Sequence, residues 1–242
     1  MASLLVLWDV DLTLINAGGV GRAIYEIAFR EMFGRELPVV SVSVSMAGRT
    51  DRAIALDILT GAGIPDARGQ IDEFQAIQAA HAPSLAGRIS ARGCVLPGVS
   101  AALAAVAQAR PGVRVIQSVL TGNVRAMADV KLGSLGLTHH LDLDAGAYGT
   151  ESEIRADLVP VAQRNAAARY GEDFTGDRTV LVGDTPLDIE AALAVGARAV
   201  GVATGSFSVE DLAEAGADAA LDDLSDTDQA VRAILGQPRG DR

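Results

Sequence analysis

The stretch LLVLWDVDLT, residues 4–13, decides the fold, because a short apolar run ends there in two carboxylates. A continuously apolar run of this length is typical of a strand that is buried on both faces of a parallel sheet. Side chains two residues apart in a strand point the same way, so we expect Asp9 and Asp11 to face one spot at the strand's carboxyl end while Val10 turns away. Two neighbouring carboxylates repel unless a cation lies between them or one of them holds a proton. The stretch therefore predicts either a metal site or a nucleophile beside an acid/base.

Short apolar runs and helical patterns alternate along the chain after residue 97. Strands are expected at residues 113–120, 140–145, 178–182, 197–202 and 219–221, and helices at residues 99–109, 123–135, 154–170, 187–195, 209–215 and 226–235. This alternation predicts an α/β fold in which helices cover a parallel sheet. Ligands of such sheets bind beyond the carboxyl ends of the strands, so the carboxylates after the first strand are expected at a ligand site.

Residues 16–93 interrupt this alternation. Three stretches of the segment have helical patterns, residues 18–33, 51–59 and 69–89, and Pro83 is expected to break the last of them. The segment lies between the first predicted strand and the rest of the sheet, and the sequence Leu96-Pro97-Gly98 marks the return to the sheet. We therefore expect an inserted α-helical domain at residues 16–93 and a core made of residues 1–15 and 94–242.

The bulk composition excludes several classes of protein. The 242 residues carry a net charge of −11, and no basic block offsets it, which disfavours nonspecific binding to nucleic acid or to an anionic membrane. No apolar stretch approaches the roughly 18 residues of a membrane span. The first eight residues lack the basic start of a signal peptide, and the single cysteine, Cys94, cannot form an internal disulfide. We expect a cytoplasmic globular protein that binds neither nucleic acid nor membrane.

Polar residues follow two further predicted strands. Thr121 offers a hydroxyl, Gly122 lets the backbone come close, and Asn123 begins a helix, whose N-terminal N–H groups bind phosphate well. An ordinary helix N-cap would explain the same residues. Asp184 ends another strand and Asp188 follows four residues later, so both carboxylates can face the strand-end pocket and suit Mg²⁺. The alternative is that Asp184 only caps the helix.

Three basic residues are candidates to bind an anionic ligand near these carboxylates. Arg155 opens a predicted helix close to the expected pocket, whereas Lys131 lies mid-helix and could equally be a solvated surface residue. In the insert, Gly48 permits a tight turn from which Arg49 could reach the ligand when the insert closes. Alternatively, Thr50 caps the next helix and Arg49 is a solvated charge. The sequence leaves the choice between Arg155 and Lys131 open.

The order and spacing of these motifs resemble those of the haloacid dehalogenase (HAD) superfamily of phosphohydrolases over nearly the whole chain. Three of the superfamily's motifs have counterparts here: Asp9-x-Asp11-x-Thr13, then Thr121, then Gly183-Asp184-x-x-x-Asp188. The insert resembles the helical C1-type cap of some members, and the sequence Leu96-Pro97-Gly98-Val99 resembles the return from that cap in phosphoglycolate phosphatase-like members. The resemblance implies a three-layer, Rossmann-like core with a parallel sheet, plus an inserted α-helical cap domain.

The same resemblance implies a Mg²⁺-dependent phosphomonoester hydrolase (a phosphatase) that works through an aspartyl-phosphate intermediate. Asp9 would be the nucleophile and Asp11 the acid/base. The residues that bind the substrate or its phosphate would be Thr13, Arg49, Thr121, Gly122, Asn123 and Arg155. The metal would be held by Asp9, Asp11 (through its carbonyl), Asp184 and Asp188. The substrate would be a small phosphorylated metabolite, such as phosphoglycolate or a sugar phosphate. Two positions depart from the pattern. Arg155 stands where the superfamily usually has lysine, and Trp8 stands where phenylalanine is common.

The residues present argue against two other reactions of the same superfamily. Asp11 argues against a dehalogenase, which needs no acid for its leaving group. Residues 16–93 contain no lysine, which argues against a phosphonate hydrolase that forms a Schiff base on the cap. A sugar-phosphate mutase similar to β-phosphoglucomutase shares all the core motifs and stays open, as does a non-catalytic binding protein on the same fold. The oligomeric state, monomer or small homo-oligomer, also stays open.

Overall fold

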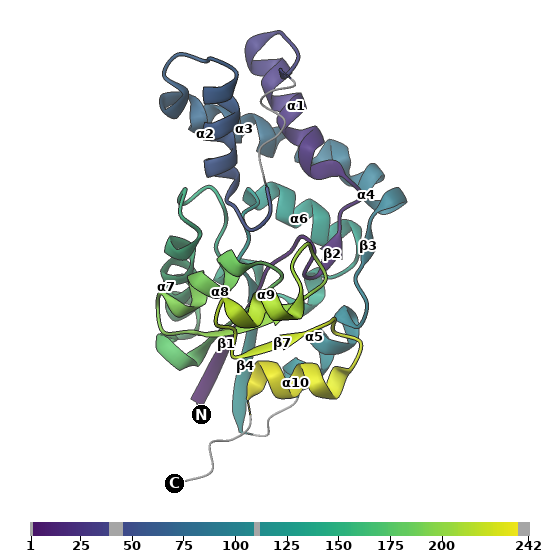
Figure 1. Ribbon diagram of the computed structural model, residues 1–242, viewed down its shortest axis with the longest axis vertical. Helices are drawn as coiled ribbons and strands as arrows, with labels where there is room; N and C mark the ends of the chain where they lie inside the picture. The colour runs from purple at the N-terminus through teal and green to yellow at the C-terminus, as the bar shows by residue number, and fades with distance from the viewer. Residues whose placement is uncertain (1, 39–45, 109–111, 237–242) are drawn as a thin grey trace.

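The protein is built on a five-stranded parallel sheet, seen in the computed structural model, which describes residues 2–38, 46–108 and 112–236 (Figure 1). The strands follow the order β4-β1-β5-β6-β7, and every neighbouring pair is parallel. Their bounds are β1 Ala2–Trp8, β4 Val113–Val119, β5 Thr179–Gly183, β6 Arg198–Val202 and β7 Ala219–Leu221. The strand β1 is therefore an interior strand, paired with β4 on one side and β5 on the other, and the two aspartates follow its carboxyl end.

Helices cover both faces of this sheet. The first face packs against α5 (Val99–Gln108), α6 (Arg125–Ser134) and α10 (Thr227–Leu235). The second face packs against α7 (Leu158–Tyr170), α8 (Pro186–Leu193) and α9 (Val209–Glu214). The helix-covered parallel sheet predicted from the alternation of strands and helices is confirmed, and so is the three-layer core that the family resemblance implies.

The side chains of β1 explain why its sequence is apolar without interruption. Val6 and Trp8 join the apolar cluster on the first face, whereas Leu5 and Leu7 join the cluster on the second face. All four side chains are fully buried. A strand buried on both faces cannot alternate apolar and polar residues, and it turns polar only where the sheet ends.

One predicted strand is wrong. Residues 140–145 form no strand but parts of two short 3₁₀ turns, Thr138–His140 and Leu143–Ala145. The Asp142 side chain accepts a hydrogen bond from the N–H of Asp144 and is held by Arg169 and Tyr170. Such local hydrogen bonds from an aspartate compete with the ladder of a sheet. Just after this segment, Ala147 forms an isolated parallel β-bridge with Leu120, which follows β4.

Most other predicted elements occur within a few residues of their expected bounds. The helix predicted at residues 154–170 begins later, at Leu158, because a 3₁₀ turn at Arg155–Asp157 precedes it. The helix predicted at residues 99–109 runs to Gln108, and its expected last residue lies outside the described part of the chain.

The segment between residues 16 and 94 contains helices, as predicted. It contains α1 (Val20–Phe33), α2 (Asp51–Gly61), α3 (Ile71–His81) and α4 (Ala86–Arg92). A 3₁₀ turn at Ala82–Leu85 separates the last two helices at the expected break around Pro83. A two-stranded antiparallel ribbon, β2 (Ile15–Asn16) with β3 (Cys94–Val95), connects these helices to the sheet layer. The exact division into core and cap stays a prediction.

The start of α2 is fastened to the core through the backbone. The N–H of Asp51 donates to the carbonyl of Gly122 over 2.6 Å, and the N–H of Val124 donates to the Asp51 carboxylate over 2.7 Å. The two backbone segments are so close that a Cβ atom on Gly122 would lie 1.9 Å from the carbonyl oxygen of Arg49. A Cβ on Gly149 would lie 1.7 Å from the Gly122 carbonyl. Glycine is therefore required at both positions for this contact.

Within the described ranges, no helix combines the length and the apolar character needed to cross a bilayer.

Candidate functional site

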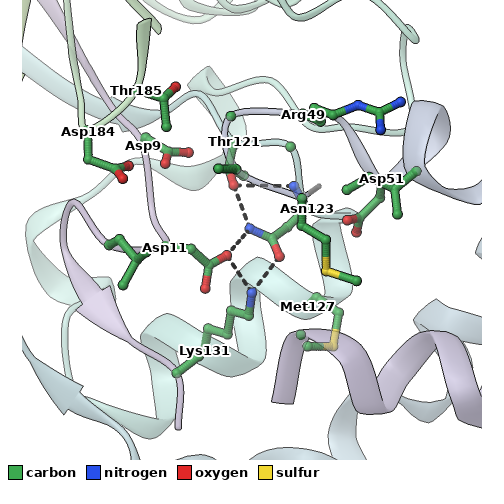
Figure 2. Close-up of a pocket in the computed structure, with 18 of the residues that line it drawn as sticks. Asp9, Asp11, Arg49, Asp51, Thr121, Asn123, Met127, Lys131, Asp184 and Thr185 are labelled. Atoms are coloured by element: carbon green, nitrogen blue, oxygen red, sulfur yellow. Dashed lines mark hydrogen bonds and ion pairs between the residues drawn. The ribbon is translucent and has the colours of Figure 1, made fainter. Parts of the chain in front are cut away.

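A cavity of about 280 Å³ lies where the carboxyl ends of β1, β4 and β5 face the helical insert (Figure 2). The residues that line it come from three strand ends, from α6, from the insert and from the 3₁₀ turn that begins at Arg155. Among them are Asp9, Asp11, Thr121, Gly122, Asn123, Asp184, Thr185, Arg155, Lys131, Met127, Tyr25, Ile24, Ile54, Arg49 and Asp51. The structure thus brings most of the predicted site residues into one cavity. Thr13 and Asp188 lie just behind its wall, bonded to residues of the site.

Three carboxylates form a compact acidic cluster at this site. One oxygen from each of Asp9, Asp184 and Asp188 lies within 4.8 Å of the other two, and all three residues are buried. Thr13 supports the cluster, because its hydroxyl donates to Asp184 Oδ1 over 3.2 Å. An all-oxygen donor set rich in carboxylates is the kind that Mg²⁺ prefers, so the residues present fit this ion.

The electrostatics of the cluster also favour a cation. Burial raises the pKa of Asp9 to about 7, with repulsion from Asp188 and Asp11 adding to the rise and Arg155 opposing it. Burial raises the pKa of Asp184 to about 8, and the negative charges of Asp9 and Asp188 contribute. Carboxylates in this position hold protons at neutral pH unless more positive charge is supplied.

Arg155 provides one positive charge inside the cluster. Its Nη2 lies 2.7 Å from Asp9 Oδ1 and 2.6 Å from Asp188 Oδ1, and the side chain is buried. The guanidinium also donates to the backbone carbonyls of Gly48 and Leu120, over 3.2 and 3.3 Å. Arg155 therefore joins the nucleophile candidate, the acidic cluster and the insert. Among the described residues, its buried Nε–H has no acceptor.

The role of N-cap of α8 belongs to Thr185, not to Asp184. Thr185 and Asp188 form a capping box, in which Asp188 Oδ2 accepts from the backbone N–H and the hydroxyl of Thr185. Because Asp188 is bonded to Thr185 on one side and to Arg155 on the other, its place is fixed by the protein. The Asp184 carboxylate is left to face the cavity.

A second polar network lines the same cavity (Figure 2). The Asn123 amide donates to Thr121 Oγ1 over 2.6 Å and to Asp11 Oδ2 over 2.8 Å. Lys131 Nζ contacts Asp11 Oδ2 at 2.5 Å and Asn123 Oδ1 at 2.6 Å. Lys131 is only 2% exposed, so the interpretation as a solvated surface residue is wrong. Both candidate cations are thus in the site, Arg155 beside Asp9 and Lys131 beside Asp11.

The insert contributes its own polar residues to the cavity. The hydroxyl of Tyr25 donates to Asp51 Oδ1 over 2.5 Å, and burial raises the pKa of Asp51. Arg49 lines the cavity, but its guanidinium is bonded to Asp57 Oδ2 at 2.7 Å, and Figure 2 shows it directed away from Asp9. Thr50 is the N-cap of α2, as one reading of the sequence has it.

Sequence reasoning did not identify Tyr25 or Asp51 as site residues. Tyr25 stands on the apolar face of a helix, and Asp51 stands in a first helical turn, where acidic residues are common for local electrostatic reasons. Neither position carries a motif that points to a cavity. Their places depend on how the insert packs on the core, which no local pattern records.

Comparison with known proteins agrees with this geometry. The family model described as HAD-hydrolase-like matches residues 155–227, a segment that contains Arg155 and the two aspartates Asp184 and Asp188. No curated protein matches the chain.

Solved structures resemble almost the whole chain. A hydrolase from Pseudomonas syringae is 18% identical, with 96% of this chain and 99% of that chain covered and a TM-score of 0.66. A predicted phosphatase from Clostridium acetobutylicum is 16% identical, with 98% and 100% covered and a TM-score of 0.64. A haloacid dehalogenase-like family protein from Streptococcus pneumoniae is 15% identical, with 91% and 94% covered and a TM-score of 0.57. The chain therefore has the fold of haloacid dehalogenase-like hydrolases, and its residues 155–227 match the HAD-hydrolase-like family.

Proposed function

We propose that this protein is a phosphatase that hydrolyses small phosphomonoesters, with Asp9 as its nucleophile. The observation that carries the proposal is the surroundings of Asp9. Its carboxylate is buried against Arg155 in an acidic cluster, and Asp11 lines the same cavity from the same strand end. A carboxylate nucleophile, a second carboxylate and a buried cation are the parts that phosphoryl transfer through a covalent intermediate needs.

We assign Mg²⁺ as the cofactor. Asp9, Asp184 and the backbone carbonyl of Asp11 would hold it, with Asp188 supporting the ion or its waters. When bound, Mg²⁺ would offset the negative charge of the phosphoryl group and of the acidic cluster. The raised pKa values of Asp9 and Asp184 support this assignment, because the single positive charge of Arg155 does not offset the three carboxylates of the cluster.

In the first step, an oxygen of Asp9 forms a bond to phosphorus while the bond from phosphorus to the leaving oxygen breaks. Asp11 gives its proton to that leaving oxygen, so that an alcohol departs. The Thr121 hydroxyl and the Arg155 guanidinium bind the phosphoryl oxygens, and Gly122 lets the backbone approach them. The Asn123 amide supports this site by donating to Thr121 and Asp11. Thr13 acts from behind through Asp184.

In the second step, the oxygen of a water molecule attacks phosphorus and the bond to Asp9 breaks. Asp11 takes the proton of that water, and inorganic phosphate leaves. The anchored insert would keep bulk water out of the cavity during both steps.

The cavity favours a small substrate. Its volume of about 280 Å³ lies below the range of pockets that hold drug-sized ligands. Besides its polar residues, the cavity is lined by the side chains of Ile24, Ile54, Met127 and Tyr25. We propose a small phosphorylated metabolite, such as phosphoglycolate or a sugar phosphate. Arg49 would contact the part of it that leaves once its ion pair with Asp57 opens.

Release of phosphate from p-nitrophenyl phosphate tests the proposal. We expect turnover by the wild type with Mg²⁺, none with EDTA, and none for Asp9→Asn at unchanged thermal stability. Turnover by Asp9→Asn would remove Asp9 as the nucleophile. A panel of sugar phosphates then separates hydrolysis from transfer, because an isomerised sugar phosphate without phosphate release would indicate a mutase.

A further inference from the structure

Lys131 is an unusual residue for this chain. It is the only lysine among the 20 Lys and Arg residues of the sequence. It lies on α6, is 2% exposed, and places its ammonium at the cavity wall. A buried ammonium group is expensive to desolvate, and replacing a buried ion pair by apolar residues is often neutral or stabilising. Packing alone therefore does not account for a lysine here.

The contacts of Lys131 dictate how the Asn123 amide is oriented. An ammonium group has only hydrogen-bond donors, so the amide atom that it meets at 2.6 Å must be the oxygen, Oδ1. The NH₂ group of the amide then points the other way. It donates to Thr121 Oγ1 over 2.6 Å and to Asp11 Oδ2 over 2.8 Å (Figure 2).

The orientation of the amide in turn dictates what Thr121 can do. Thr121 Oγ1 accepts from the Asn123 amide and also from the Asn123 backbone N–H over 3.3 Å. A hydroxyl has two acceptor lone pairs and one proton, so two incoming hydrogen bonds leave the proton free to be donated elsewhere. Thr121 lines the cavity, and the partner that its position offers is an oxygen of the bound ligand.

We propose that Lys131 is a positioning residue that sets the polarity of this network. It holds Asn123 so that Thr121 donates to the phosphoryl group, and it holds the Asp11 carboxylate at the leaving oxygen. The proposal rests on the proposed phosphatase function. Without Lys131 the amide can turn over, and its oxygen then faces Thr121 and Asp11. Thr121 would donate to that oxygen instead of the ligand, and the Asp11 carboxylate would lose both of its donors.

Kinetics with two classes of ester test the proposal in the full chain. Lys131→Met keeps an unbranched stem and removes the ammonium. For the alkyl phosphomonoester that the wild type turns over fastest, we expect kcat to fall by about 100-fold or more, as for loss of general acid catalysis. For p-nitrophenyl phosphate, whose leaving group needs little protonation, we expect a fall that is at least several-fold smaller. Asp11→Asn should show the same selectivity, and the double variant should lose little more than either single variant.

Matched controls separate this role from a structural one. Arg232→Met removes a positive charge from an exposed position of α10 and should leave both activities unchanged. Lys131→Arg keeps the charge but not the compact ammonium, so we expect it to rescue neither ester fully. Equal losses of both activities in Lys131→Met at unchanged thermal stability would overturn the proposal.

A measurement without catalysis keeps the proposal separate from the proposed function. Protein grown with ¹⁵N-lysine carries a single side-chain Nζ signal, because the chain has one lysine. We expect this signal to exchange slowly with water and to shift in both Asp11→Asn and Asn123→Ala. A rapidly exchanging signal that neither substitution moves would overturn the positioning role, whatever the protein hydrolyses. Failure of the wild type to release phosphate from any ester, with the expected signal present, would count against the phosphatase function alone.

Discussion

At the scale of single residues, the acidic cluster decides how the protein responds to pH and to Mg²⁺. Asp9 and Asp184 have pKa values of about 7 and about 8 in the folded protein, against an ordinary value of 3.8. Between about pH 4 and pH 8 the folded protein therefore binds more protons than the unfolded chain. The free energy of unfolding that these groups contribute must fall as the pH rises through this window.

We predict that the metal-free protein unfolds more easily at pH 8 than at pH 6, and that Mg²⁺ stabilises it more at pH 8. The ion competes with protons for the same oxygens, so it binds better where the protons have left. Urea denaturation at both pH values, in EDTA and in Mg²⁺, measures both effects.

Asp184→Asn is the control for this prediction. The variant removes one titrating carboxylate, so its stability in EDTA should depend less on pH than that of the wild type, and Mg²⁺ should stabilise it less. A wild-type stability that rises from pH 6 to pH 8 in EDTA, relative to this variant, would contradict the assigned pKa shifts.

At the scale of elements, the contact between the start of α2 and the core depends on two glycines. A Cβ on Gly122 would meet the Arg49 carbonyl oxygen at 1.9 Å. Because that oxygen belongs to the backbone, it cannot move aside as the end of a flexible side chain could. We predict that Gly122→Ala lowers the free energy of unfolding by about 1–3 kcal/mol, the usual penalty of overpacking. It should also raise amide hydrogen exchange at Asp51 and Val124, which bond across this contact.

Gly133→Ala is the matched control. Gly133 lies in α6 with helical backbone and has no atom within 4 Å of an added Cβ. Alanine there should be neutral or stabilise the protein by about 0.5–1 kcal/mol, because it favours the helix. Equal effects of the two substitutions on unfolding and on exchange would refute the tight contact.

Elements with strong local signals could be predicted from the sequence. The strand β1 shows an uninterrupted apolar run, and the helix α8 begins with a threonine and a proline that fit a capped first turn. The wrongly predicted strand at residues 140–145 has an apolar pattern too, but Asp142 there bonds within the segment and to two residues of α7. Those partners lie 27 and 28 residues away in sequence, beyond any local window.

At the scale of the whole molecule, the topology explains which site residues could be found in advance. Asp9, Thr121 and Asp184 each follow a strand of one parallel sheet, and such strand ends must meet at the same edge. Lys131 and Tyr25 reach the cavity from helices. Their position depends on which side of each helix packs inward. A helix that lies between the core and the insert can be apolar on more than one side, so its pattern does not tell which side faces the cavity.

We predict that the insert and the core unfold together. A single apolar cluster contains Ile24 and Phe29 of α1, Val106 of α5 and Trp8 of β1, so loss of either part exposes the other. Trp8 is the only tryptophan and is fully buried. Urea transitions followed by its fluorescence and by far-ultraviolet circular dichroism should coincide. A separate early transition in the dichroism alone would mean that the helical insert melts first.

The burial of Lys131 has a consequence for chemistry at the surface of the protein. Because it is the chain's only lysine and is 2% exposed, the folded chain offers no accessible ε-amine to solvent. Enzymes that acetylate or ubiquitinate lysine would find no acceptor side chain on it in the native state. Reagents such as succinimidyl esters would be restricted to the α-amino group, so amine coupling would tether every molecule at one end and in one orientation.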